Sequence, residues 1–104
     1  MTKNTNEYGW LSPNGTFYHV PWGEHQCWAN NWLKKHNMQK EWLNTGLSSG
    51  DFLCNKGWVL LHNPSGKTAL ITHSKPLTKQ QRDFIYQYYI DRGLITEANK
   101  LYDI

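Results

Sequence analysis

The sequence lacks the patterns of several large protein classes. Its 104 residues include only two cysteines, Cys27 and Cys54. Two are too few for a disulfide scaffold, so we expect free thiols, with one bridge between them as the alternative. No apolar run approaches about 18 residues and no signal-peptide pattern is present, so we expect neither a membrane span nor secretion. These absences favour a cytoplasmic location.

Motifs of catalysis and of metal binding are also missing. There is no glycine-rich phosphate loop, no Gly-x-Ser-x-Gly and no paired carboxylate motif. Cys27 lies near His25, but residues two apart on a helix do not face each other. The candidate metal ligands lack Cys-x-x-Cys or His-x-x-x-His spacing; they are His19, His25, His62, His73, Cys27 and Cys54. A site shared by His19 and His73 stays open, because they end equivalent strands. We expect no enzyme, no cofactor and no resident metal.

Aliphatic residues are scarce, and large aromatic residues replace them. Leu, Ile, Val and Phe account for 21 of the 104 residues, whereas there are six Trp and six Tyr. Each Trp or Tyr buries a large area and carries one polar group that needs a partner. We therefore expect a folded domain with an aromatic-rich core and some rings at the surface. The net charge of +3 is mildly basic, below that of a dedicated DNA-coating protein.

Two β-hairpins are predicted from Pro-polar-Gly turns. In the first, Ser12-Pro13-Asn14-Gly15 suits a type I turn closed by a left-handed glycine. Counting outward gives the pairs Leu11–Phe17, Trp10–Tyr18 and Tyr8–Val20. The second turn is Asn63-Pro64-Ser65-Gly66, which gives the pairs Leu61–Ala69, Leu60–Leu70, Val59–Ile71 and Trp58–Thr72. The two Gly-Trp hairpins lie 48 residues apart and suggest a weak internal repeat.

An amphipathic helix follows each hairpin. The first has a stripe at helical spacing, formed by His25, Trp28, Ala29, Trp32, Leu33 and His36. The second begins with a capping box, Thr78-Lys79-Gln80-Gln81, and ends at Gly93, with Leu94 placed for a Schellman cap. A short turn around Trp42 and Leu43 ends near Gly46, and another ends at Gly57.

The chain is therefore predicted to be one α+β domain with a four-stranded, mainly antiparallel sheet in the order ββα–ββα. Its predicted segments are a frayed start (1–7), the first hairpin and helix (8–37), a short helical connection (38–56), the second hairpin and helix (57–93) and a short C-terminal helix (94–104).

Three stretches of the chain carry a recognisable pattern: GWLSPNGTFYHVPWGEHQCWA, FLCNKGWVLLH and PLTKQQRDFIYQYYIDRG. They resemble a loose group of short bacteriophage and prophage proteins, mainly of Gram-positive bacteria. The likeness covers roughly residues 8–93 and consists of a glycine–aromatic start, a Pro/Asp/Asn-Gly turn, a Gly-x-His before a helix, a Gly-Trp strand and a Leu-Thr-x-x-Gln helix. No catalytic residue is carried over. The resemblance implies a phage-type accessory protein in the cytoplasm of a bacterial host.

The surplus of aromatic rings suggests a function in binding. Two helices are expected to cover one face of the sheet, which leaves Trp10, Tyr18, Trp58 and Leu60 on the other. Clustered Trp and Tyr are typical of protein interfaces, so a host protein is the predicted partner, and a homodimer would also cover this face. The opposing interpretation, held about equal, is that residues 38–56 bury the face. A nucleic acid is the second candidate partner, contacted by exposed rings and by Lys34, Lys35, Lys67, Lys79 and Arg82.

Overall fold

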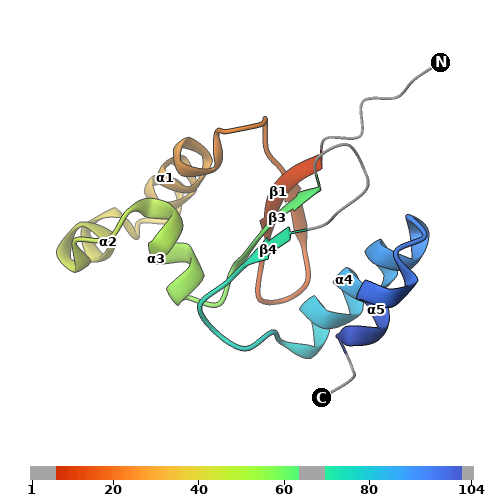
Figure 1. Cartoon of the computed structure of the whole chain (residues 1–104). Helices are drawn as coiled ribbons and strands as arrows, with labels where there is room; N and C mark the ends of the chain where they lie inside the picture. Colours follow the sequence, from red (N-terminus) through yellow and green to blue (C-terminus); the bar gives the residue numbers. More distant parts are fainter. Residues whose placement is uncertain (1–6, 64–69, 102–104) are drawn as a thin grey trace.

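One antiparallel sheet lies between two groups of helices in the computed structural model, which describes residues 7–63 and 70–101 (Figure 1). The strands are β1 (Glu7–Leu11), β2 (Phe17–His19), β3 (Val59–Asn63) and β4 (Leu70–Thr72). The helices are α1 (His25–Lys35), α2 (Gln39–Thr45), α3 (Ser49–Asn55), α4 (Lys79–Asp91) and α5 (Ile95–Lys100). The strand order is β2-β1-β3-β4, so β2 and β4 form the two edges. The predicted α+β class and the four-stranded antiparallel sheet are confirmed.

The first hairpin has the predicted register. Trp10 pairs with Tyr18 and Leu11 with Phe17, and the Val20 N–H donates to the carbonyl of Tyr8 at 2.9 Å. Gly15 has a φ of 89°, which a residue with a side chain rarely adopts, and its N–H donates to the Ser12 carbonyl at 3.0 Å. The turn chemistry of this segment therefore sets the pairing of its strands.

The second hairpin is paired two residues away from the prediction. The observed pairs are Leu60–Thr72, Leu61–Ile71 and His62–Leu70, so the predicted partners of all four residues, Leu61, Leu60, Val59 and Trp58, are wrong. The rest of the predicted turn, Pro64-Ser65-Gly66, and the partner Ala69 lie outside the described residues. Because side chains alternate with a period of two, a two-residue shift keeps every side chain on its predicted face. β3 also pairs with β1, from Glu7–Asn63 to Leu11–Val59, and so its position is set by more than its own turn.

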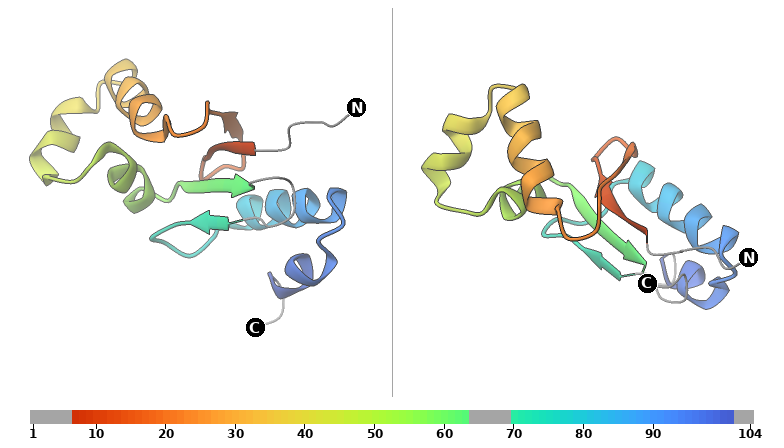
Figure 2. Two further views of the ribbon diagram at one scale, coloured as in Figure 1. Left: turned by 45° about the horizontal axis from the view of Figure 1, so that its top comes forward. Right: turned by 90° about the horizontal axis from the view of Figure 1, so that it is seen from above.

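The two long helices cover opposite faces of the sheet, which corrects the expectation that they share one. Figures 1 and 2 show α1, α2 and α3 on one side and α4 and α5 on the other. The first core lies between the sheet and α1 and α3, and includes Tyr8, Trp10, Val20, Ala29, Leu33, Phe52, Leu53, Cys54 and Trp58. The second lies toward α4 and α5, and includes Leu11, Val59, Leu61, Ile85, Tyr88, Tyr89 and Ala98. A sheet apolar on both faces requires such double cover.

The ends of the helices follow the local sequence. The Thr78 hydroxyl accepts from the Gln81 N–H at 3.1 Å, and the Gln81 side chain accepts from the Thr78 N–H at 2.9 Å, which confirms the capping box of α4. At its other end, the Leu94 N–H donates to the carbonyl of Tyr89 at 2.8 Å across Gly93, as in a Schellman cap. Among the described residues, no helix is both long enough and apolar enough to cross a membrane.

Candidate functional site: an aromatic groove beside an edge strand

The four residues expected on an open aromatic face differ in how much of each side chain is exposed. Trp10 is 1% exposed and Trp58 is 5% exposed, because α1 and α3 pack over them. Leu60 is half-buried in the same cluster. Tyr18 is 37% exposed, since it lies on the edge strand β2. The expectation that all four lie on a free surface is therefore wrong, and only Tyr18 remains at an open site.

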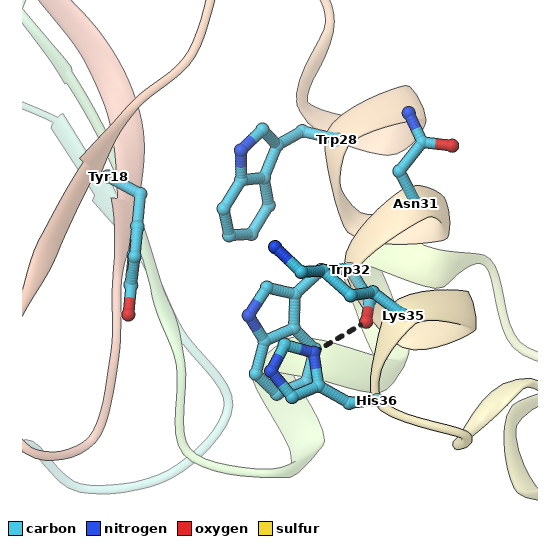
Figure 3. A pocket seen from close by; sticks show the side chains of 6 residues that line it. All are labelled: Tyr18, Trp28, Asn31, Trp32, Lys35 and His36. Atoms are coloured by element: carbon cyan, nitrogen blue, oxygen red, sulfur yellow. Dashed lines mark hydrogen bonds between the residues drawn. The ribbon is translucent and has the colours of Figure 1, made fainter.

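A groove lined largely by rings lies between Tyr18 and one side of α1. It has a volume of about 480 Å³, and its lining consists of Tyr18, Trp28, Asn31, Trp32, Lys35 and His36. Figure 3 shows the rings of Trp28 and Trp32 pointing from α1 toward the strand that carries Tyr18, with Lys35 extended along the same side of the helix. The helical spacing of residues 28, 32, 35 and 36 places these side chains on adjacent turns of α1.

Packing beneath the groove fixes its rings in place. The ring of Trp58 lies 5.0 Å from that of Trp32, 5.9 Å from that of Tyr18 and 6.0 Å from that of Trp28. At the end of α1, the His36 ring stacks on Trp32 at 4.0 Å, and its Nδ1 lies 2.9 Å from the Trp32 carbonyl oxygen. A ring that is already held in place loses little further conformational entropy when it makes a contact.

A second hollow lies beside the turn of the first hairpin. It has a volume of about 350 Å³, shares Tyr18 and Trp32 with the groove and is further lined by Ser12, Pro13, Asn14 and Trp58. The two hollows therefore have two lining residues in common. The β1–β2 turn therefore contributes to the candidate site as well as to the fold.

Lys35 gives the groove one positive charge, but the predicted basic residues do not gather around it. Lys34 and Lys35 lie in the last turn of α1. Lys79 and Arg82 are on α4, across the sheet, and the Lys79 ammonium pairs with Asp83 at 2.9 Å. Lys67 lies outside the described residues. None of the residues that line the groove is a carboxylate.

A smaller hollow flanks the opposite face of β2. It has a volume of about 220 Å³ and is lined by Glu7, Phe17, His19, Phe84, Gln87, Tyr88, Asp91 and Arg92. Phe17 stacks on Phe84 of α4 at 5.5 Å, which gives the hollow an apolar wall.

Two charged residues of this smaller hollow, Glu7 and Arg92, form an ion pair. The Arg92 Nε donates to Glu7 Oε1 at 2.7 Å, and a second guanidinium nitrogen donates to Glu7 Oε2. The hydrogen bond from Arg92 lowers the pKa of Glu7, with a further contribution from the Tyr88 hydroxyl. Burial is the main cause that raises the pKa of Tyr88, followed by its bond to the Glu7 carboxylate. This network joins the start of β1 to the end of α4.

The histidines and cysteines do not assemble into a metal centre within residues 7–63 and 70–101, where no group of three or more suitable ligands exists. His19 lies on β2 and His73 follows β4, so they belong to opposite edges of the sheet and share no site. The Nδ1 atom of His25 forms a hydrogen bond with the Tyr8 hydroxyl. Both cysteines are free, and burial raises the pKa of the Cys54 thiol.

Trp28, Trp32 and His36 were predicted only as part of the stripe at helical spacing on α1, and the predicted binding site did not include them. The stripe also contains two histidines, and the helix ends in two lysines. This mixture of rings and polar groups is the signal that part of the helix borders water. Comparison with known proteins found no matching family model, no matching curated protein and no matching solved structure.

Proposed function

We propose that this chain is a non-catalytic binding protein that holds a segment of another protein in the aromatic groove between α1 and β2. The observation that supports the proposal is the half-open row of Tyr18, Trp28 and Trp32, in a fold that buries Trp10 and Trp58 completely enough to hold the row rigid. Trp and Tyr in preformed hollows contribute most of the binding energy in protein interfaces. The volume of the groove is within the usual range of binding pockets.

The resemblance to short phage proteins makes a bacterial host protein the proposed partner, in the cytoplasm of the host cell. An accessory protein of this kind would act by occupying a surface of a host enzyme or defence protein. Inhibition by occupation requires no catalytic group in the binding protein. The positive charge of Lys35, in a groove whose lining contains no carboxylate, favours a partner segment with negative charge.

A single-stranded nucleic acid is the second candidate, because rings beside a lysine also stack on bases. The positions of the basic residues favour a nucleic acid less than they favour a protein segment. Lys79 and Arg82 lie across the sheet from the groove, so a strand in the groove would meet only the lysines at the end of α1. With so few phosphate contacts, its binding would show only a shallow dependence on salt.

An affinity pull-down from a bacterial lysate, with and without nuclease, tests the proposed function. Lys35→Glu is the groove variant, and Lys34→Glu is its matched control, with the same charge change at a neighbouring residue that does not line the groove. We expect the wild type and Lys34→Glu to retain the same protein in both arms, and Lys35→Glu to lose most of it. Loss of the retained material on nuclease treatment, or equal retention by both variants, would contradict the proposal.

A further inference from the structure

The edge strand β2 has main-chain groups that face away from the sheet. The strand order places β2 at the end of the sheet, with β1 as its only neighbour among the described strands. Hydrogen bonds join Tyr8 to Val20 and Ser12 to Thr16, so the bonded pairs fall on alternate residues and include Trp10–Tyr18. The N–H and C=O groups of Phe17 and His19 therefore point outward from the edge.

Hollows flank both faces of this edge. The Tyr18 side chain lines the aromatic groove on the α1 side, and Phe17 and His19 line the 220 Å³ hollow on the α4 side. A chain that pairs with β2 would place its side chains alternately into these two hollows, since side chains in a strand alternate between faces. An edge strand between two hollows is the arrangement that β-strand addition requires.

We propose that the edge of β2 binds an extended segment of another protein as a fifth strand, with an acidic side chain over the aromatic groove and apolar side chains in the opposite hollow. This inference rests on the proposed function and names the conformation and chemistry of the bound segment. The acidic residue lies opposite Tyr18, within reach of Lys35. Its two neighbours lie opposite Phe17 and His19 and contact the wall formed by Phe17 and Phe84.

Charge favours a foreign segment over a second copy of this chain. If two β2 edges paired antiparallel around a twofold axis, both copies would present Lys35 on the same face of the joined sheet. Like charges across such a junction repel each other. The groove has no carboxylate in its lining to relieve this repulsion. A partner segment with its own carboxylate removes this repulsion.

The probe is the peptide Gly-Ser-Val-Glu-Phe-Ser-Gly, blocked at both ends and titrated into the full ¹⁵N-labelled chain. We expect amide shifts centred on Phe17, Tyr18 and His19, with a Kd on the order of 1 mM or tighter. The same peptide with Lys in place of Glu should bind about tenfold more weakly. Lys35→Glu should reverse this preference. The absence of saturable shifts at β2, or equal binding of both peptides, would overturn the proposal.

Two substitutions at one position test the main-chain contact. His19→Pro removes an outward N–H from the edge without removing a bond to β1, and proline is tolerated in edge strands. His19→Val removes the ring and keeps the N–H. We expect His19→Val to bind the peptide and His19→Pro to lose at least about tenfold in affinity, the cost of one or two hydrogen bonds. Equal affinity for the two variants would refute strand addition.

N-methylation of the peptide gives an independent measurement on the unmodified protein. Methylation of alternate peptide nitrogens should abolish binding, while methylation of those between should leave it unchanged, because only every second N–H faces β2. A uniform response would refute strand addition. If the pull-down partner depends on Lys35 but ignores His19→Pro, the groove still binds a protein and only the inference about the edge fails. A wild-type dimer that His19→Pro converts to monomer would identify a second copy as the occupant and overturn the proposal.

Discussion

Gln81 is predicted to be the residue whose loss most weakens the joint between α4 and the rest of the fold. It is fully buried. Its amide nitrogen donates to the carbonyls of Gly57 at 2.6 Å and Ser12 at 3.2 Å, and its amide oxygen accepts from the Thr78 N–H. One side chain therefore ties the start of α4 to the first turn and to Gly57, two residues before β3.

Gln81→Met nearly keeps the volume and removes all three bonds. The Ser12 carbonyl retains its bond from Gly15, so the Thr78 N–H and the Gly57 carbonyl lose the most. At about 1–3 kcal/mol for each unsatisfied buried group, the free energy of unfolding should fall by about 2–5 kcal/mol. Urea unfolding followed by tryptophan fluorescence measures this change. The neighbouring Gln80→Ala, at an exposed position, should change it by less than about 0.5 kcal/mol.

Gln81→Glu separates the helix cap from the two donated bonds. Glutamate is an accepted capping-box residue, so the bond from Thr78 survives. Its carboxylate would lie against two carbonyl oxygens, which raises its pKa in the folded state. The variant should therefore lose stability relative to wild type as pH rises through the ordinary glutamate pKa near about 4.3. If Gln81→Met and Gln81→Glu both had the same free energy of unfolding as wild type at pH 7, the reasoning about the buried hydrogen bonds of Gln81 would be refuted.

Three further predictions concern the core, the ion pair and the first strand. Trp58→Ala should cost about 3–5 kcal/mol in urea unfolding, because Trp58 is 5% exposed among four other rings. Trp22→Ala, at a residue 61% exposed, should cost less than about 1 kcal/mol. The pKa of Glu7 is lowered, so its stabilisation is complete above about pH 5 and is lost as pH falls through the folded-state pKa; Glu7→Gln should therefore be less stable at pH 7 and should show a weaker acid dependence between about pH 5 and 3. Gly9→Ala should cost about 3 kcal/mol, measured by thermal unfolding, because the added carbon would lie 2.3 Å from the Tyr18 carbonyl oxygen.

Local signals in the sequence predicted the elements well. The turn at Asn14-Gly15, the capping box at Thr78 and the stop at Gly93 each depend on residues adjacent in the chain, and all three were confirmed. The second hairpin was misplaced because two apolar faces give the same pattern after a two-residue shift.

The candidate site was harder to predict than the fold. The expected patch combined Trp10 and Trp58, which are core, with Tyr18, which lines the groove. All three are large aromatic residues that were expected on the same face of the sheet, so the sequence pattern could not show which of them are buried. The rings that complete the groove with Tyr18 come from α1, and their exposure depends on how that helix packs against the sheet.

By itself, the sequence determined the class of the fold, the ends of its helices and which strand residues share a face of the sheet. These follow from backbone conformations and side-chain periods that are set within a few residues. Only the tertiary structure decided which face each helix covers, which rings are buried and which edge of the sheet is free. Those properties depend on contacts between segments far apart in the chain. The packing of α1 and α3 over Trp10 and Trp58 leaves Tyr18 in an open groove at the edge of β2.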